Sequence, residues 1–186
     1  MRRTDEDIQD ELLVLECQDG DADALKTLIA RWQPRIARFA FRLTGEREAG
    51  TDVVQETWLA IVRGIRRLDD PARFRTWAYR IVAHKCADWT RRRVAGRRAD
   101  SESRKSAIGA YSAPSRESEV EEEAVRMRAA MSELPEEQRA ILSLHYLDGL
   151  SVAEIAGVLA IPPGTVKSRL FYAREHLRQA FERVGT

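Results

Sequence analysis

The sequence is short of cysteine and of long apolar runs, and each shortage excludes a class of protein. Its two cysteines, Cys17 and Cys86, are too few for the disulfide framework of a small secreted domain. No apolar run approaches the roughly 20 residues needed to span a bilayer. The start, MRRTDEDIQDE, has no apolar core and so does not predict a signal peptide. We therefore expect a cytoplasmic protein.

Signals of β-structure are also missing from the 186 residues. There is no sustained alternation of apolar and polar residues and no Asn-Gly hairpin. Helical periodicity recurs instead, with candidate caps and a Pro/Gly turn between the helices. We expect four helices in the first half: from Thr4 or Asp5 to Cys17, from Asp21 or Asp23 to Thr44 with a kink or break at Pro34, from Thr51 or Asp52 to Ile65, and from Phe74 to Arg93.

Helical periodicity stops between residues 95 and 118, where Ser, Arg, Gly and Ala dominate. A structureless stretch of this length is improbable inside one compact domain, so it predicts a linker. The expected fold is all-α, with two small helical domains at 1–94 and 119–186 joined by a flexible linker at 95–118.

The net charge of +1 conceals two basic blocks. Residues 61–93 carry ten basic and three acidic side chains, and residues 160–186 carry five and two. The segments 1–60 and 117–159 are acidic. Two separate basic blocks predict two surfaces for a polyanion such as nucleic acid.

The strongest local motif is a helix-turn-helix at residues 151–177. Ser151 and Glu154 form a capping-box pattern, and IPPG separates a short helix from a longer one. The spacing of the second helix predicts a buried stripe of Val166, Leu170, Ala173 and Leu177. The residues expected to face outward, or to flank that stripe, are Lys167, Ser168, Arg169, Phe171, Tyr172 and Arg174. Cations and exposed aromatics suit a DNA major groove, although a merely solvated amphipathic helix would share the pattern.

The second motif interleaves aromatic and basic residues at 73–93, RFRTWAYRIVAHKCADWTRRR. Aromatic rings can stack on unpaired bases, and arginines neutralise phosphates. The alternative is a core helix with buried aromatics and solvated arginines. Burial in the core is expected in any case for Phe74, for Ile81 and for one of the two tryptophans.

Together these motifs resemble a bacterial sigma factor of the small extracytoplasmic-function (ECF) group, which keeps only sigma domains 2 and 4. The resemblance rests on DVVQETW at 52–58, FRTWAYRIVAHKCADWTRRR at 74–93, and the stretch from LPEEQRAIL to YAREHL at 134–177. It covers roughly residues 20–93 and 119–182.

The resemblance implies a function and a role for each matching residue. It implies that the chain binds core RNA polymerase, through the β′ clamp coiled coil and the β flap, and directs initiation at promoters. Polymerase contact is implied for Asp52, Gln55 and Glu56. Recognition and melting of the −10 element is implied for Asp69, Asp70, Arg73, Trp77, Arg80, His84, Asp88, Arg91 and Arg92. Reading of the −35 element is implied for Lys167, Ser168, Arg169, Phe171, Tyr172 and Arg174.

Two positions depart from the family pattern. His84 stands where the family usually has Asn, and Tyr172 stands where it often has Arg, so the promoter sequence is left open. The resemblance also implies an anti-sigma protein as a partner, no cofactor and no catalytic chemistry. A rival interpretation is a stand-alone helix-turn-helix regulator whose residues 1–93 sense a ligand or dimerise. The isolated His84, Cys86, His145 and His176 do not predict a metal site.

Overall fold

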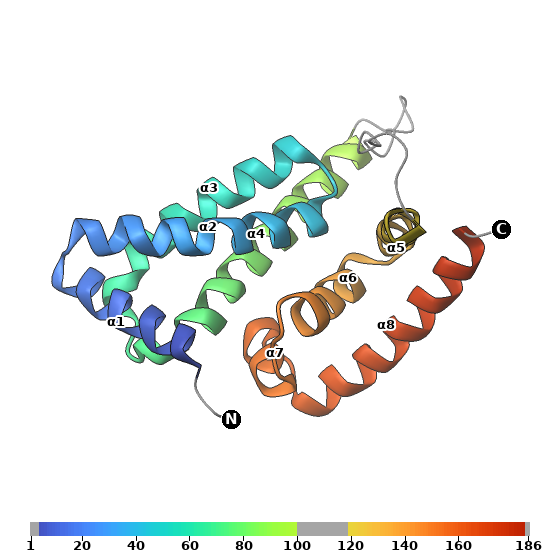
Figure 1. Ribbon diagram of the computed structural model, residues 1–186. Helices are drawn as coiled ribbons and strands as arrows, with labels where there is room; N and C mark the ends of the chain where they lie inside the picture. Colours follow the sequence, from blue (N-terminus) through green and yellow to red (C-terminus); the bar gives the residue numbers. More distant parts are fainter. Residues whose placement is uncertain (1–3, 100–118, 185–186) are drawn as a thin grey trace. The chain divides into compact units, whose positions relative to one another are not determined.

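The computed structural model describes residues 4–99 and 119–184 (Figure 1). All regular structure within these ranges is helical, as predicted. Helices α1–α4 form one compact unit, and nearly all of the described residues from Glu119 on form a second. Most of the expected linker, residues 100–118, lies outside the described residues, and residues 95–99 continue the preceding helix.

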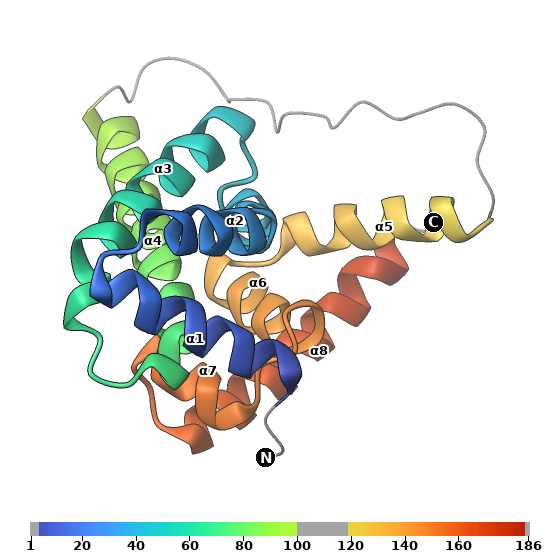
Figure 2. The ribbon, with the colours of Figure 1, turned by 60° about the vertical axis from the view of Figure 1, so that its left-hand side comes forward.

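The first unit contains six helical segments. They are α1 (Asp5–Asp19), α2 (Ala22–Thr44), α3 (Arg47–Gly64), the 3-10 turns η1 (Ile65–Arg67) and η2 (Pro71–Arg73), and α4 (Phe74–Ala99). Helix α4 packs against both α2 and α3 (Figure 1, Figure 2). It ends six residues beyond the expected Arg93.

Local capping starts the first two helices where the sequence predicts. The Thr4 hydroxyl accepts a hydrogen bond from the Asp7 backbone N–H at 3.2 Å, and the Asp7 carboxylate accepts one from the Thr4 N–H at 2.9 Å. An Asp21 carboxylate oxygen accepts from the backbone N–H groups of Asp23 and Ala24. These bonds satisfy N–H groups that have no partner inside the helix.

The break considered at Pro34 does not occur, because α2 runs without interruption from Ala22 to Thr44. Proline removes the hydrogen bond to the carbonyl four residues earlier, which belongs to Ala30. Both residues are exposed, so that carbonyl can bond to water instead.

Helix α3 begins at Arg47, four residues before the expected cap at Thr51. Gly50 therefore lies inside the helix and is buried. A Cβ built on Gly50 would lie 2.0 Å from Cδ1 of Phe41 on α2. Only glycine accommodates this approach without moving the Phe41 ring, so Gly50 lets α2 and α3 pack closely.

An aromatic cluster and a partly buried ion pair hold the first unit together. Trp32 meets Phe74 and Tyr79 edge to face, with ring centroids 5.1 Å and 5.9 Å apart. The Arg31 guanidinium lies 2.6 Å from the Asp10 carboxylate, which fixes α1 to α2. Phe74 and Tyr79, two aromatics of the basic motif, are therefore core residues.

The second unit contains five helical segments. They are α5 (Glu119–Glu133), α6 (Glu136–Leu142), the π-helical turn η3 (Ser143–Leu147), α7 (Val152–Leu159) and α8 (Pro163–Val184). Helix α8 packs against α5 and α6.

The predicted helix-turn-helix is formed by α7 and α8. The Ser151 hydroxyl accepts from the Glu154 N–H at 3.3 Å, and the Glu154 carboxylate accepts from the Ser151 N–H at 2.8 Å, which is the expected capping box. Ala160 ends α7 in the left-handed conformation, with φ of 53°. Helix α8 begins at Pro163, inside the IPPG sequence expected to separate the two helices, and the first turn tolerates proline because its N–H groups have no partner within the helix.

Candidate nucleic-acid interface

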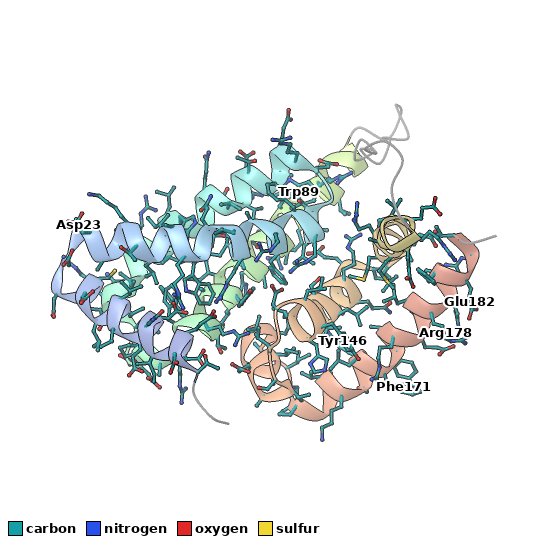
Figure 3. The ribbon with its side chains drawn as sticks, in the orientation of Figure 1. Asp23, Trp89, Tyr146, Phe171, Arg178 and Glu182 are labelled. Carbon is teal, nitrogen blue, oxygen red and sulfur yellow. The ribbon has the colours of Figure 1, made fainter. Side chains whose placement is uncertain are left out.

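The outer side of α8 carries the side chains expected to enter a DNA groove. Lys167 and Ser168 are exposed, and Phe171 and Tyr172 are each 60% exposed. The two rings meet edge to face with centroids 5.5 Å apart, and Figure 3 shows Phe171 pointing away from the body of the unit. The predicted stripe is buried at Val166, Leu170 and Ala173 and half-buried at Leu177. The fold therefore does not need the two exposed aromatic rings for packing.

The two arginines beside the stripe are held by other elements of the unit. Arg169 forms an ion pair with Glu137 of α6, with 3.0 Å between guanidinium and carboxylate. Arg174 donates a hydrogen bond to the Tyr146 hydroxyl in η3 at 3.3 Å. Both contacts connect α8 to the elements before it.

In the second half of α8, Arg178 forms ion pairs within the helix, and Arg183 pairs with Glu133 of α5. Arg178 donates to Glu175 and to Glu182, each at 2.7 Å (Figure 3). The hydrogen bond from Arg178 lowers the pKa of Glu175 below its usual value. Lys167, in the first half of the helix, is exposed to an outside anion, and Arg174 keeps its charge because its Tyr146 partner is neutral.

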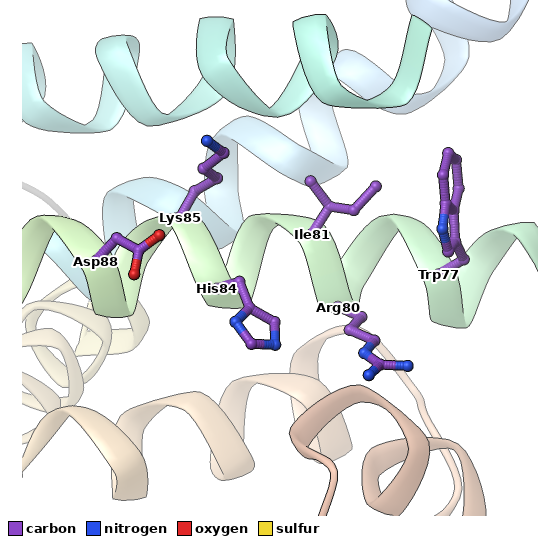
Figure 4. Close-up of a pocket in the computed structure, with 6 residues that line it drawn as sticks. All are labelled: Trp77, Arg80, Ile81, His84, Lys85 and Asp88. Carbon is purple, nitrogen blue, oxygen red and sulfur yellow. The ribbon is translucent and has the colours of Figure 1, made fainter. Parts of the chain in front are cut away.

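One face of α4 gathers four of the residues expected at the −10 element. Trp77, Arg80, His84 and Asp88 follow one another at intervals of three and four residues, so they share a side of the helix. With Ile81 and Lys85 they line a shallow pocket (Figure 4). Arg80 and His84 are exposed, whereas Trp77 and Asp88 are half-buried.

Trp77 combines an inner packing contact with an outer surface. A Cβ built on Gly64 would lie 2.8 Å from Cζ2 of Trp77, so the ring rests directly on α3. Its centroid lies 6.1 Å from that of Phe74. Trp89 on the same helix is half-buried and has the Arg93 guanidinium 5.0 Å from its ring centroid.

The loop before α4 is shaped by Asp70. Its carboxylate accepts from the Ala72 N–H at 3.1 Å and pairs with the Arg73 guanidinium at 3.1 Å. Asp69 beside it is exposed. The carboxylate of Asp70 therefore fixes the turn that leads into the α4 face.

The residues expected to contact polymerase separate into two groups on α3. Asp52 and Gln55 are exposed, while Val54 on the opposite side is buried. Glu56 points toward α4, where its carboxylate lies 3.0 Å from the Lys85 ammonium and 3.7 Å from the Arg92 guanidinium. Glu56 is thus already engaged by the basic helix.

Four exposed apolar residues were not singled out by the sequence patterns. Leu59 and Val62 on α3 are 55% and 44% exposed, and Tyr146 and Leu147 in η3 are 55% and 60% exposed. Leu59 could have been found from its position, because it lies four residues after Gln55 and therefore on the same side of the helix as this expected contact residue.

The part of the chain that the structure describes holds no group of three or more His, Cys, Asp or Glu side chains arranged to bind a metal. Within the same ranges, no helix is both long and apolar enough to cross a membrane. Cys17 and Cys86 are free and buried, and burial raises the pKa of the Cys17 thiol.

Two family models match the chain, one in each unit. Sigma-70 region 2 matches residues 28–95, and sigma-70 region 4 matches residues 124–177. The first match includes the α3 and α4 faces, and the second includes the helix-turn-helix. A regulator with a separate sensory domain would not account for the first match.

Curated relatives extend the similarity over nearly the whole chain. The ECF RNA polymerase sigma-E factors of Salmonella typhimurium and Escherichia coli strain K12 are each 33% identical over 181 residues, covering 91% of this chain and 93% of theirs. The ECF RNA polymerase sigma factor SigW of Bacillus subtilis is 28% identical, covering 89% and 93%.

Solved structures share the fold. The sigma factor RpoE, in complex with the anti-sigma factor NepR from Bartonella quintana, matches with a TM-score of 0.72 and 19% identity, covering 85% of this chain and 96% of its own. CnrH, in complex with the cytosolic domain of CnrY, matches with a TM-score of 0.70 and 24% identity, covering 94% and 98%.

Proposed function

Because this chain belongs to the ECF group of the sigma-70 family, we propose that its two units divide the reading of a promoter between them. As a sigma factor it binds core RNA polymerase and directs initiation at specific promoters. In this proposal residues 1–94 act as sigma domain 2 and residues 119–186 as sigma domain 4. Residues 95–118 connect them.

The −35 element is read by the outer side of α8. Lys167 and Ser168 are exposed in its first turns, where a recognition helix reaches base edges in the major groove. The exposed Phe171 ring offers an apolar surface to a thymine methyl group. Arg169 and Arg174 are already bonded to Glu137 and Tyr146, so we assign them to orienting the helix and to phosphate contact.

The −10 element is opened and held by the α4 face and the loop before it. Arg80 and His84 are exposed beside the outer surface of Trp77, and stacking on that ring would stabilise a base that has left the duplex. Asp69, Asp70 and Arg73 would border the flipped base. Asp88, Arg91 and Arg92 continue the face toward the backbone.

Core polymerase is bound by the exposed side of α3. Asp52 and Gln55 supply polar groups, and Leu59 supplies exposed apolar surface beside them. We assign Glu56 a positioning role because its carboxylate connects this helix to Lys85 and Arg92 of the DNA-facing helix.

The proposal also covers location and partners. The protein acts in the cytoplasm, where promoter DNA and polymerase are found, and it contributes no catalytic group because the polymerase forms the RNA bonds. An anti-sigma protein is an expected partner, since similar folds have been solved in complexes, RpoE with the anti-sigma factor NepR among them.

The observation that carries the proposal is that basic side chains are exposed on two separate helices, one in each family-matched unit, beside the half-buried Trp77 ring on α4 and the exposed Phe171 and Tyr172 rings on α8. The test is run-off transcription of a barcoded template library with randomised −35 and −10 positions, with core polymerase alone and with the protein added. The protein should add transcripts from templates that share two sequence elements. Transcripts identical to those of core alone, together with duplex binding that needs no polymerase, would favour the regulator interpretation.

A further inference from the structure

Helix α1 has apolar side chains on two opposite faces. On the inner face, Val14 and Cys17 are buried against the rest of the unit. On the outer face, Ile8, Leu12 and Leu15 are 45%, 54% and 43% exposed. Their spacing of four and three residues places them in one stripe along the helix.

A surface helix ordinarily carries polar residues opposite its core face. The stripe of α1 instead leaves about half of the surface of each of three large aliphatic side chains in water. Contiguous exposed apolar surface of this kind marks a contact site for another molecule.

Acidic residues border the stripe. Asp5, Glu16 and Asp19 are exposed, and Glu11 is half-buried on the other side. The sequence of α1 contains no lysine or arginine. The stripe therefore lies in a negative field, which restricts what can cover it.

Charge excludes three of the possible occupants. Nucleic acid and anionic lipid would both be repelled by these carboxylates. A second copy of α1 packed on the first would bring the same carboxylates together, which is destabilising. What remains is a protein surface with apolar side chains and basic flanks.

We propose that the outer face of α1 is a docking site for a basic amphipathic helix of a partner protein. Ile8, Leu12 and Leu15 would pack against the apolar stripe of that helix, and Asp5, Glu16 and Asp19 would pair with its Lys or Arg side chains. This surface is separate from the α3, α4 and α8 faces assigned to polymerase and promoter, so the inference goes beyond the proposed function.

The test uses the full chain and a fluorescent synthetic peptide of about 18 residues, or five helical turns, with a leucine stripe flanked by Lys and Arg. Anisotropy should show saturable binding of this peptide. A peptide with the same stripe but Glu flanks, and a scrambled basic peptide, should each bind at least roughly tenfold more weakly.

Matched variants locate the site. Leu12→Gln should weaken binding of the basic peptide roughly tenfold, because it removes the centre of the stripe. Leu59→Gln is the control, since Leu59 on α3 has the same exposure of 55% against 54% and should leave peptide binding unchanged. Glu16→Gln should reduce the salt dependence of binding. Thermal unfolding of each variant verifies that the fold is kept.

Three results would overturn the inference. They are an absence of saturable binding by the basic peptide, equal loss in Leu12→Gln and Leu59→Gln, and equal binding of the scrambled peptide. Run-off transcription separates this outcome from failure of the proposed function. Leu12→Gln should transcribe like the parent, and a loss of transcription with unchanged peptide binding would instead assign the stripe to polymerase.

Discussion

Truncation of Trp77 tests whether the α4 face captures unstacked bases. The ring is half-buried, since its inner edge rests on Gly64 and its outer part lies in the pocket with Arg80 and His84. Removing a fully buried tryptophan or phenylalanine costs about 3–5 kcal/mol. Because only part of Trp77 is enclosed, we expect Trp77→Ala to lower the free energy of unfolding by about 1.5–2.5 kcal/mol.

The functional loss should be separable from this loss of stability. Stacking of a base on an aromatic ring contributes about 1–3 kcal/mol, which corresponds to roughly 5- to 150-fold in the equilibrium for opening. Trp77→Ala should therefore form closed complexes with core polymerase but open them poorly, measured by permanganate reactivity of thymines. A template already unpaired at the −10 element should restore most of the activity, because its bases are unstacked beforehand.

Trp89→Ala is the matched control for this experiment. Trp89 is also half-buried on α4 but lies about 120° around the helix from Trp77, beneath the Arg93 guanidinium. It should lose stability without any defect that an unpaired template restores. If the unpaired template rescues neither variant, or rescues both equally, Trp77 acts only in packing and the stacking assignment is refuted.

Three further predictions concern other parts of the chain. Lys167→Ala should reduce transcription more from a promoter with a matching −35 element than from one lacking it, with a loss of discrimination of about 1–3 kcal/mol. Arg91→Ala should weaken binding to both promoters alike and lower the salt dependence of that binding. Leu59→Gln should weaken binding to core polymerase in a pull-down titration, with unchanged thermal stability, because its side chain is 55% exposed. Hydrogen bonds from the backbone N–H groups of Ala24 and Asp23 lower the pKa of Asp21. The Asp21 carboxylate therefore stabilises the folded protein above the ordinary aspartate pKa, and this stabilisation is lost as the pH falls through the lowered pKa. Asp21→Asn should reduce the loss of unfolding free energy at acid pH, measured by urea titrations at a series of pH values. An unchanged dependence of the unfolding free energy on pH would contradict the assignment.

Features set by neighbouring residues could be predicted from the sequence. The capping box of Ser151 and Glu154 depends on side chains three residues apart, and it forms as expected; the first helix begins at Asp5, one of its two predicted starts. The buried stripe of α8 follows from helical spacing, and Val166 and Leu170 lie on it. The sigma-factor resemblance joined these local signals and named the family correctly.

Features set by distant residues could not be predicted in the same way. Helix α3 begins at Arg47 with no side-chain cap to mark that start, and the close approach of Gly50 to Phe41 depends on another helix. The partners of Glu56 and Arg169 depend on which helix lies opposite, Lys85 of α4 in one case and Glu137 of α6 in the other. Helical spacing gives the direction of a side chain but not the neighbour that it meets.

The ion pairs on α4 bear on how the protein searches a chromosome. Four of its cations have carboxylate partners: Lys85 and Arg92 with Glu56, Arg91 with Asp88, and Arg93 with Glu46. Such exposed pairs add little to stability, but each carboxylate competes with phosphate for its cation. Binding of this helix to random duplex therefore releases fewer counterions from the DNA than its basic residues alone would allow, and non-specific binding is weakened. A protein whose cations are paired in this way spends less time on non-promoter DNA and remains available to polymerase.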